Sequence, residues 1–477
     1  MVTRQIFEWA EKTPERTALE YNGEPWSYRG FAAAIAAARG HFQRRGIFGD
    51  GVAVMAVGHL RDFWVFSLAL RSLGLTTIAV HPAEALSSLR LNGVRCVVAS
   101  ASEHWPGLAD RCAGRGWPLV SAVSEGEAPL GLNGAQPVGG HILRTSGTTG
   151  EYKMLLFEPA LEAEYLRLRR VVSGMNQDSV TNLFEFGGWT GVGHKAPSNA
   201  WTVGAIIVFH QGLEPHLVLR RQGITNSTVV PGTLAAILAQ PEGAFPRSET
   251  MKLSIIGGTV TQAQIDEAKA RITPNLYNGL GSTESHVIAD TPLNTPDDHR
   301  WHRLVPSSIV QLVDAFDQPV PVGQVGRVRV GSQGGPTRYL DDEEATKAFF
   351  RDGFFYPGDL AVMREDGRIA LQGRVTEVIN INGHKISPAP IEDRLREALG
   401  VTGVCLLSMQ NDRGEEELHL VIEAATPVDT ATLAGVLRAE LHGLPGVHVR
   451  YASALPRNAM GKVLRQALTV DVIAARF

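Results

Sequence analysis

Short apolar runs alternate with segments of helical pattern along the first part of the chain, and this alternation limits the fold more than any other feature. Residues 51–57 and 76–80 are apolar runs typical of buried strands. The segment 63–73 between them has a helical pattern that ends at Gly74, a suitable C-terminal cap. Because strands separated by helices form parallel β–α–β units, we predict a large α/β domain with mostly parallel sheets. Further runs of this kind are the helical segment 31–44 and the strand-like segments 205–209, 228–230 and 253–256.

The character of the sequence changes after residue 300. Residues 300–373 carry short apolar runs and Gly-rich turns, which predict a β-rich subdomain. A small α+β unit is expected to follow, and its first helix should be capped by Ser387, begin at Pro388 and end at Gly400. Its other expected elements are strands at 404–407 and 418–422 and a helix at 431–441. The predicted domains are therefore an N-terminal domain, 1–375, and a C-terminal domain, 376–477.

Composition excludes several classes of protein. Lys and Arg number 45 and Asp and Glu number 49, so the net charge of −4 gives no reason to expect a nucleic-acid partner. The three cysteines are far apart and form no CxxC pair, which disfavours a disulfide framework or a zinc site and fits a reducing cytoplasm. The beginning of the sequence has no apolar signal core, and the apolar runs are too short to span a bilayer. We therefore expect a cytoplasmic protein without a membrane span.

The segment from Thr145 to Lys153, TSGTTGEYK, alternates hydroxyl side chains with glycines after a strand-like run. Glycine allows sharp turns that bring backbone N–H groups close to an anion, and Ser and Thr hydroxyls add donors. The pattern suits a triphosphate, although it does not match the Walker A loop, and a plain polar hairpin turn is the alternative. The residues predicted to bind the phosphates are Thr145, Ser146, Gly147, Thr148, Thr149, Gly150 and Lys153.

A second Gly-rich segment, NGLGSTE, ends at Glu284. The hydroxyl of Thr283 can donate to a phosphate, and Glu284 can hold Mg²⁺ through one carboxylate while phosphates fill other positions of the ion. An ordinary Gly-rich turn closed by a charged residue is the alternative. The other members predicted to bind the nucleotide are Gly279, Leu280, Gly281 and Ser282.

Two more segments carry groups suited to a nucleotide. Asp359, in the sequence YPGD, can accept hydrogen bonds from both hydroxyls of a ribose, and Arg374 can reach the same sugar or a phosphate. Lys462, in the sequence PRNAMGKVLR, lies on an expected turn, where a solvated surface lysine is the alternative.

Each motif alone is weak, but their order and spacing are specific. From Trp26 to Arg465 the chain resembles the ANL superfamily of adenylate-forming enzymes, which comprises acyl-CoA synthetases, nonribosomal-peptide adenylation domains and beetle luciferases. Further matching segments are WSY at 26–28, VVPGT at 229–233, GG at 257–258, GRV at 373–375 and GHKISP at 383–388.

The resemblance implies a role for each motif. The loop 145–153 would close over the β- and γ-phosphates, Thr283 would contact the α-phosphate, and Glu284 would hold Mg²⁺. The ribose hydroxyls would bind Asp359, with Arg374 nearby.

For the small C-terminal domain, the resemblance implies movement. Lys462 would bridge the carboxylate and the α-phosphate during adenylation, and the domain would then turn about a hinge at Thr376 to admit a thiol.

The sequence departs from the usual family pattern at several positions. Leu280 replaces the aromatic side chain that stacks on adenine, and Thr376 replaces the usual Asp or Lys of the hinge. Tyr152 and Pro357 replace a Pro and a Thr. Asn380 stands where a lysine often serves thioester formation, so the thiol step is less securely predicted than adenylation.

In the family the acid pocket lies between the region around Leu183 and the strands near Gly257 and Gly279. The first wall of the pocket has the sequence LFEFGGW at 183–189. Its aromatic side chains favour an apolar or aromatic acid; the alternative is that they belong to the hydrophobic core and do not contact substrate. Glu185 either pairs with an amino or hydroxy group of the acid or is an exposed glutamate at a strand end. The predicted pocket residues are Phe184, Glu185, Phe186, Trp189, Gly257 and Gly258.

The resemblance therefore predicts an AMP-forming acid–thiol ligase that uses ATP and Mg²⁺ to make an acyl-AMP and transfers the acyl group to coenzyme A. The alternative is a stand-alone adenylating enzyme that loads the phosphopantetheine of an acyl carrier protein, or an amine, with an amino-acid-like substrate among the possibilities. No fused carrier domain is expected, because the sequence ends soon after Arg465. A non-enzymatic nucleotide-binding relative is disfavoured by the intact Lys462, Glu284, Thr283 and Asp359.

Overall fold

The computed structural model shows a chain that packs into two compact units. The first comprises Met1–Thr228, Ser282–His286 and Ser332–Gly353, and the second comprises Val229–Gly281, Val287–Gly331 and Phe354–Phe477. The residues that the structure describes are 2–80, 86, 89–103, 105–126, 138–146, 152–184, 186–331, 334–381, 384–411, 416–424, 426–441, 446–457, 463–465 and 467–469.

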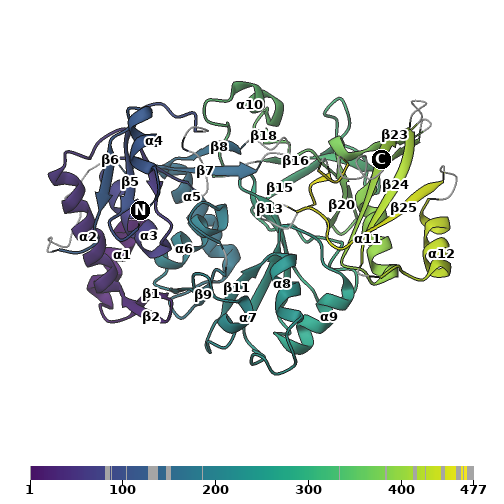
Figure 1. Cartoon of the computed structure of the whole chain (residues 1–477), viewed down its shortest axis with the longest axis horizontal. Helices are drawn as coiled ribbons and strands as arrows, with labels where there is room; N and C mark the ends of the chain where they lie inside the picture. Colours follow the sequence, from purple (N-terminus) through teal and green to yellow (C-terminus); the bar gives the residue numbers. More distant parts are fainter. Residues whose placement is uncertain are drawn as a thin grey trace. The chain divides into compact units, whose positions relative to one another are not determined.

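The first unit contains a six-stranded sheet of order β6-β5-β3-β4-β7-β8, in which neighbouring strands are parallel except β7 and β8. The buried central strand β3 explains the continuous apolar run seen in the sequence, because both of its faces are covered. The strands are β3 (Val52–Ala56), β4 (Thr76–Ala79), β5 (Val94–Ser100), β6 (Leu119–Ala122), β7 (His141–Ser146) and β8 (Tyr152–Phe157). Helices α1 (Val2–Lys12), α2 (Tyr28–Arg44) and α3 (Leu60–Ser72) pack against one another in the same unit, which also holds α4 (Leu108–Gly114) (Figure 1).

A second sheet of the first unit has the order β2-β1-β10-β9-β11, and its strands are parallel except β1 and β2. They are β1 (Thr17–Tyr21), β2 (Glu24–Ser27), β9 (Val180–Asn182), β10 (Ile206–Phe209) and β11 (Asn226–Val229). The unit also contains α5 (Pro159–Ser173), α6 (Gly191–Thr202), α7 (Pro215–Val218), α10 (Glu343–Phe349) and β17 (Phe350–Arg351).

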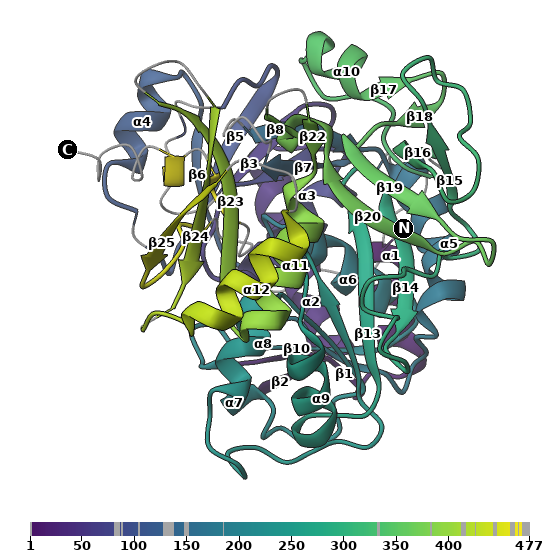
Figure 2. The same cartoon turned by 90° about the vertical axis from the view of Figure 1, so that its right-hand side faces the viewer.

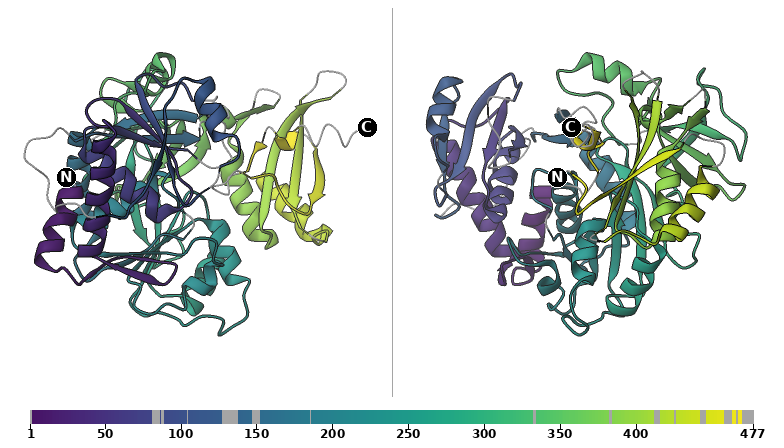
Figure 3. Two further views of the ribbon diagram at one scale, coloured as in Figure 1. Left: turned by 60° about the vertical axis from the view of Figure 1, so that its left-hand side comes forward. Right: turned by 45° about the vertical axis from the view of Figure 1, so that its right-hand side comes forward.

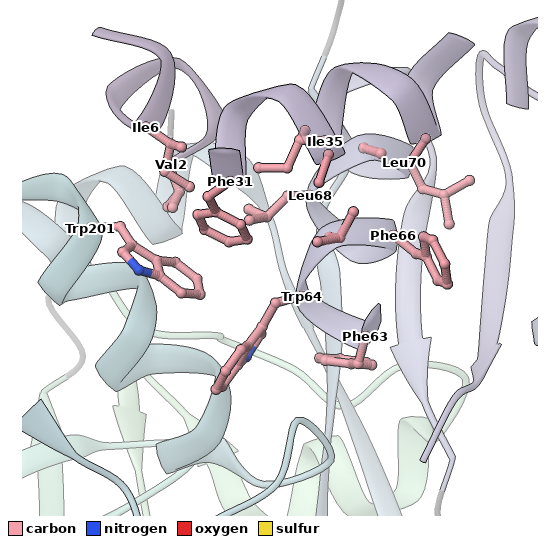
Figure 4. Packing of buried hydrophobic residues seen from close by; sticks show 14 of the residues in the cluster. Val2, Ile6, Phe31, Ile35, Phe63, Trp64, Phe66, Leu68, Leu70 and Trp201 are labelled. Atoms are coloured by element: carbon pink, nitrogen blue, oxygen red, sulfur yellow. The ribbon is translucent and has the colours of Figure 1, made fainter. Parts of the chain in front are cut away.

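Aromatic side chains from three helices form the centre of the first unit's core. The ring of Trp201 on α6 lies 4.9 Å from that of Phe31 on α2 and 5.5 Å from that of Trp64 on α3, centroid to centroid (Figure 4). Large aromatic rings contribute much of the burial energy of a core. These contacts fix α6 within the unit.

The second unit begins with α8 (Pro231–Leu238) and α9 (Gln262–Arg271) and the strands β12 (Lys252–Ile256), β13 (Leu276–Ser282) and β14 (His286–Pro292). Strand β13 pairs in parallel with β12, and β14 is its other neighbour. A mainly antiparallel sheet follows, which confirms the predicted β-rich region. Its strands in this unit are β15 (Ile309–Val313), β16 (Val325–Gly331), β18 (Phe354–Phe355), β19 (Asp359–Met363) and β20 (Ile369–Arg374).

The last part of the chain forms a three-stranded sheet with two helices on one face (Figure 2). Its order is β23-β24-β25, and the three strands run side by side in the yellow-green part of the chain (Figure 3). The elements are η2 (Val375–Glu377), β21 (Ile379–Ile381), β22 (His384–Ile386), α11 (Pro388–Leu399), β23 (Gly403–Gln410), β24 (Glu416–Glu423), α12 (Thr430–Glu440) and β25 (Val447–Ala452).

The start and end of α11 show one correct and one wrong detail of the sequence prediction. Gly400 ends the helix in the left-handed conformation, as expected. Ser387 occupies the N-cap position, but its side chain makes no capping hydrogen bond. A cap normally accepts from the second or third helical N–H, and the third residue here, Pro390, has none.

The α/β class and the strand and helix positions predicted from the sequence are confirmed, whereas the domain boundary at 375/376 stays a prediction. Across the described ranges, none of the helices combines the length and the apolar character needed to cross a bilayer.

Candidate nucleotide and acid site

Glu284 is held in a buried position in the first unit. It is 7% exposed, and the hydroxyl of Tyr339 donates to its Oε1 atom at 3.0 Å. Burial raises the pKa of Tyr339, and Glu284 raises it further, so the phenol stays a donor. The Oε2 atom of Glu284 forms no hydrogen bond with any described residue. A carboxylate with one oxygen fixed and one available fits a Mg²⁺ ion that takes most of its other ligands from phosphates and water.

Lys153 belongs to the same cluster. Its Nζ lies 3.7 Å from the ring centre of Phe349 and 5.1 Å from that of Tyr339, in cation–π geometry. Burial lowers the pKa of Lys153, and the charges of Asp342 and Glu284 oppose that shift. Tyr339 thus contacts both the predicted metal ligand and the predicted phosphate-binding lysine.

The strand register places Thr145 opposite Lys153. Strands β7 and β8 are antiparallel, with Thr145 paired to Lys153 and Ser146 paired to Tyr152. Directly paired residues point to the same face of a sheet. Gly147, Thr148, Thr149 and Gly150 lie outside the described residues, so their contact with phosphates stays a prediction.

Thr283 faces the beginning of helix α6. A Cβ atom added to Gly191 would lie 3.2 Å from the Oγ1 of Thr283, and the carbonyl oxygen of Thr283 accepts a hydrogen bond from Lys195. The turn that contains Thr283 is closed by Ser282, whose Oγ accepts from the backbone N–H of Ser285. Burial lowers the pKa of Lys195 to about 7, against the attraction of Glu284.

A buried polar network joins α6 to α3, α5 and β7. Arg71 on α3 forms a two-pronged ion pair with Glu162 on α5, with Nη1 3.2 Å from Oε1. Nε2 of His194 on α6 lies 3.0 Å from the same Oε1 atom, and the His194 ring stacks on that of His141 with 4.0 Å between centroids. Burial alone raises the pKa of Glu162, but the Arg71 charge and the His194 hydrogen bond outweigh it and hold the pKa at about 2.

The predicted acid wall is partly described. Phe184 and Phe186 are buried, and Trp189 packs against the core cluster of the first unit. Phe184 has a φ of +47°, and its N–H donates to Oδ1 of Asn182 at 3.3 Å, which supports the sharp turn after β9. Glu185 lies outside the described residues, so its role stays a prediction.

The second unit carries the predicted ribose site. Asp359 on β19 and Arg374 on β20 are register partners, and Nε of the arginine lies 3.2 Å from Oδ1 of the aspartate. Both side chains remain partly exposed, so the carboxylate can still accept from hydroxyls. The predicted hinge residue, Thr376, is exposed in the 3₁₀ turn that follows β20.

The Gly-rich segments of the second unit are closely packed. Leu280 packs against the core cluster that contains Ile288 and Val328. A Cβ atom on Gly279 would lie 2.9 Å from Ile256, and one on Gly258 would lie 3.1 Å from a ring carbon of Pro231. Gly257 has a φ of +80°.

Lys462 lies outside the described residues, but the described residues on either side of 458–462 are held by backbone contacts. Arg457 and Val463 form an antiparallel bridge, and the N–H of Leu464 donates to the carbonyl of Pro456 at 2.8 Å. Arg465 then pairs with Glu392 on α11, with Nη2 2.6 Å from Oε2.

The structure therefore unites Lys153, Thr283 and Glu284 in one unit and pairs Asp359 with Arg374 in the other. That all of them surround one nucleotide stays a prediction. Within the described ranges, His, Cys, Asp and Glu side chains form no group of three or more that could hold a metal ion without phosphate ligands. The sequence analysis missed Tyr339 and Lys195. Lys195 could have been noticed as a lone lysine in an otherwise uncharged stretch, whereas Tyr339 has no comparable signal in the sequence.

Comparisons with known proteins show what this chain is similar to. The family model described as AMP-binding enzyme matches residues 141–340, which include β7, β8 and the Glu284 and Tyr339 pair. The structure resembles ATP-bound MatB from Rhodopseudomonas palustris with a TM-score of 0.83 over 98% of both chains, at 19% identity. The chain carries an AMP-binding enzyme segment at 141–340 and has the fold of this structure over nearly its whole length. Its fold is also that of o-succinylbenzoate CoA synthetase from Bacillus subtilis in complex with ATP and magnesium, with a TM-score of 0.83, 18% identity, and 98% and 99% of the two chains covered.

The similar curated proteins fall into two groups by name, peptide synthases and acid–CoA ligases. The chain is 25% identical to a linear gramicidin synthase of Brevibacillus parabrevis over 98% of its own length, but it spans only 6% of that protein. It is 28% identical to a mitochondrial acyl-coenzyme A synthetase of Mus musculus, with 68% of this chain and 59% of the relative covered. It is 27% identical to indoleacetate–CoA ligase of Aromatoleum aromaticum, with 68% and 65% covered.

Proposed function

We propose that this chain is an enzyme of the ANL superfamily that activates a carboxylic acid with ATP and transfers the acyl group to the thiol of coenzyme A. In the first step a carboxylate oxygen attacks the α-phosphorus, and pyrophosphate leaves with the electrons of the broken P–O bond. In the second, the sulfur attacks the acyl carbon, AMP leaves, and the thiol proton passes to solvent. The observation that carries the proposal is the Glu284–Tyr339–Lys153 cluster within the AMP-binding segment.

The residues of the cluster supply what the first step needs. A carboxylate approaching a triphosphate is repelled, and positive charge placed where negative charge develops offsets that repulsion. A Mg²⁺ ion bound by Glu284 would neutralise phosphate charge. Lys153 contributes a cation from β8, Asp359 would hold the ribose, and Lys462 would bridge the two reacting groups.

Two parts of the proposed reaction have to be assigned, the class of the acid substrate and the molecule that accepts the acyl group. Buried Phe184 and Phe186 and the partly buried Trp189 favour an apolar or aromatic acid. The acyl-coenzyme A synthetases among the relatives support coenzyme A as acceptor. The similarity to a linear gramicidin synthase over nearly the whole chain supports the second candidate, which is loading of a carrier-protein phosphopantetheine with an amino-acid-like substrate.

The test is ATP–pyrophosphate exchange over a panel of aliphatic, aromatic and amino acids, followed by mass spectrometry of the products. We expect exchange that depends on one class of acid and an acyl-CoA product when coenzyme A is added. Competition between coenzyme A and a carrier protein then identifies the acceptor. Absence of exchange with every acid, in a protein that binds ATP, would refute the proposal.

Glu185 distinguishes the two substrate classes. If it pairs with a substrate ammonium, Glu185→Gln should reduce exchange with amino acids and leave acids without an amino group unaffected. An unchanged preference across the panel would leave Glu185 without a substrate role.

A further inference from the structure

Lys195 is a buried lysine that links α6 to the segment carrying Thr283 and Glu284. It lies in the second turn of α6 and is 8% exposed. Its Nζ donates to the carbonyl oxygen of Thr283 at 2.9 Å and to Nδ1 of His286 at 2.9 Å. The two acceptors lie on either side of Glu284 along the chain, so one lysine Nζ holds both ends of the short segment.

The hydrogen bond of the second ring nitrogen of His286 shows that Nδ1 is the atom that accepts from Lys195. Nε2 lies 3.1 Å from the carbonyl oxygen of Gly334, which can only accept, so Nε2 carries the proton and Nδ1 offers its lone pair to Lys195. The ring of His286 also packs against those of Phe157 and Tyr165, at 5.6 and 4.6 Å between centroids. The residue is therefore anchored from three sides.

The backbone at His286 needs this anchoring. Its φ is +61°, in the left-handed region, which costs energy for a residue with a Cβ atom. The bonds to Lys195 and Gly334 and the ring contacts offset that cost. The conformation of 282–286 thus depends on contacts with distant parts of the first unit.

Helix α6 also begins at the predicted acid wall. Its N-cap, Thr190, follows Trp189 and accepts a hydrogen bond from the N–H of Gly193. A Cβ atom on Gly193 would lie 2.0 Å from the carbonyl oxygen of Gly187, so the wall and the first turn of the helix are packed directly together. One helix therefore contacts the acid wall at its start and the 282–286 segment through Gly191 and Lys195.

We propose that Lys195 is a positioning residue for adenylation: it fixes the 282–286 segment on α6, so that the Glu284 carboxylate and the Thr283 hydroxyl keep their geometry relative to the acid wall. The inference rests on the proposed function. Groups that orient a metal-binding side chain typically contribute a factor of about 10 to 100 in metal affinity or activity, and small displacements of reacting groups are costly.

The test compares Lys195→Met with Lys195→Gln and with Lys347→Met, an exposed lysine on α10 of the same unit. Met removes the donor and the charge, whereas Gln keeps an N–H donor for the Thr283 carbonyl. We expect Lys195→Met to lower ATP–pyrophosphate exchange about 10- to 100-fold and to raise the Mg²⁺ concentration for half-maximal rate several-fold. Lys195→Gln should recover part of the exchange rate and part of the Mg²⁺ affinity. Lys347→Met should match the wild type in both measurements.

Calorimetric titration of ATP with and without Mg²⁺ supplies a readout that does not need the acid or turnover. Mg²⁺ should tighten ATP binding in the wild type, and Lys195→Met should lose most of that gain. An unchanged Mg²⁺ dependence in both assays would overturn the proposal. If Lys195→Met does not fold, Lys195→Gln and His286→Asn, which tolerates a positive φ, decide in the same assays.

If the wild type shows no exchange with any acid, the function proposed above fails. The calorimetric comparison still tests Lys195 in that case.

Discussion

Replacing Glu162 by Gln should destabilise the first unit strongly, because it breaks a buried ion pair from one side only. The side chains of Arg71 and Glu162 are 4% and 1% exposed. Gln keeps the shape and one oxygen acceptor but removes the charge, so the guanidinium of Arg71 remains buried without a counter-ion. His194 also loses a charged acceptor.

The size of the effect follows from the pKa of Glu162. The carboxyl has a pKa of about 2 in the folded protein against an ordinary 4.5. At about 1.4 kcal/mol for each pKa unit, the difference corresponds to about 3 kcal/mol of stability. Removal of one partner of a buried ion pair costs about 3–5 kcal/mol, which agrees. Since the folded pKa is the lower one, this contribution is complete above pH 4.5 and is lost as the pH falls from about 4.5 to about 2.

Chemical denaturation followed by the fluorescence of the buried Trp64 and Trp201 measures this change, because both side chains lie in the same unit. We expect Glu162→Gln to lower the free energy of unfolding by about 3 kcal/mol at pH 7 and to flatten its dependence on acid pH. Glu164→Gln is the matched control: it lies on the same helix and pairs with Arg167 in solvent, so the midpoint should barely move. Equal stability of the two variants would refute the reasoning.

Two further predictions concern the nucleotide site. Lys462→Ala should lower ATP–pyrophosphate exchange by a factor of about 100 or more, because it removes a cation from the developing charge; near-normal exchange would remove Lys462 from that role. Asp359→Asn should raise the KM for ATP about tenfold by weakening charged hydrogen bonds to the ribose, and 2′-deoxy-ATP should show a smaller difference between variant and wild type. An equal loss with both nucleotides would contradict the ribose assignment.

Helices and strands could be predicted from the sequence where the pattern that specifies them lies within a few neighbouring residues. The buried strand 52–56 and the helix ended by Gly400 were predictable, because continuous apolar runs and a left-handed glycine act within a few residues. Ser387 occupies the N-cap position but makes no capping hydrogen bond, and Pro390 removes one of the two backbone donors that such a cap can use. Even there, the helix itself was placed correctly.

The site was predictable only where its residues are contiguous. Lys153 and Glu284 stand in Gly-rich motifs and could be singled out. Tyr339 could not be singled out, because it is 55 residues from Glu284 in the sequence and contacts Glu284 and Lys153 only in the folded chain. His286 has no local signal either, since its role comes from packing against Phe157 and Tyr165.

The direct pairing of Thr145 with Lys153 has a consequence for engineering the loop between them. Because strand pairing sets the orientation of the lysine, residues inserted between 146 and 152 should lengthen the loop and leave Lys153 facing the same side. A single residue deleted inside β8 after position 153 would instead reverse the faces of the side chains on one side of the deletion relative to those on the other. Loop-length libraries should therefore be confined to the connection, and the hairpin strands kept at their present length.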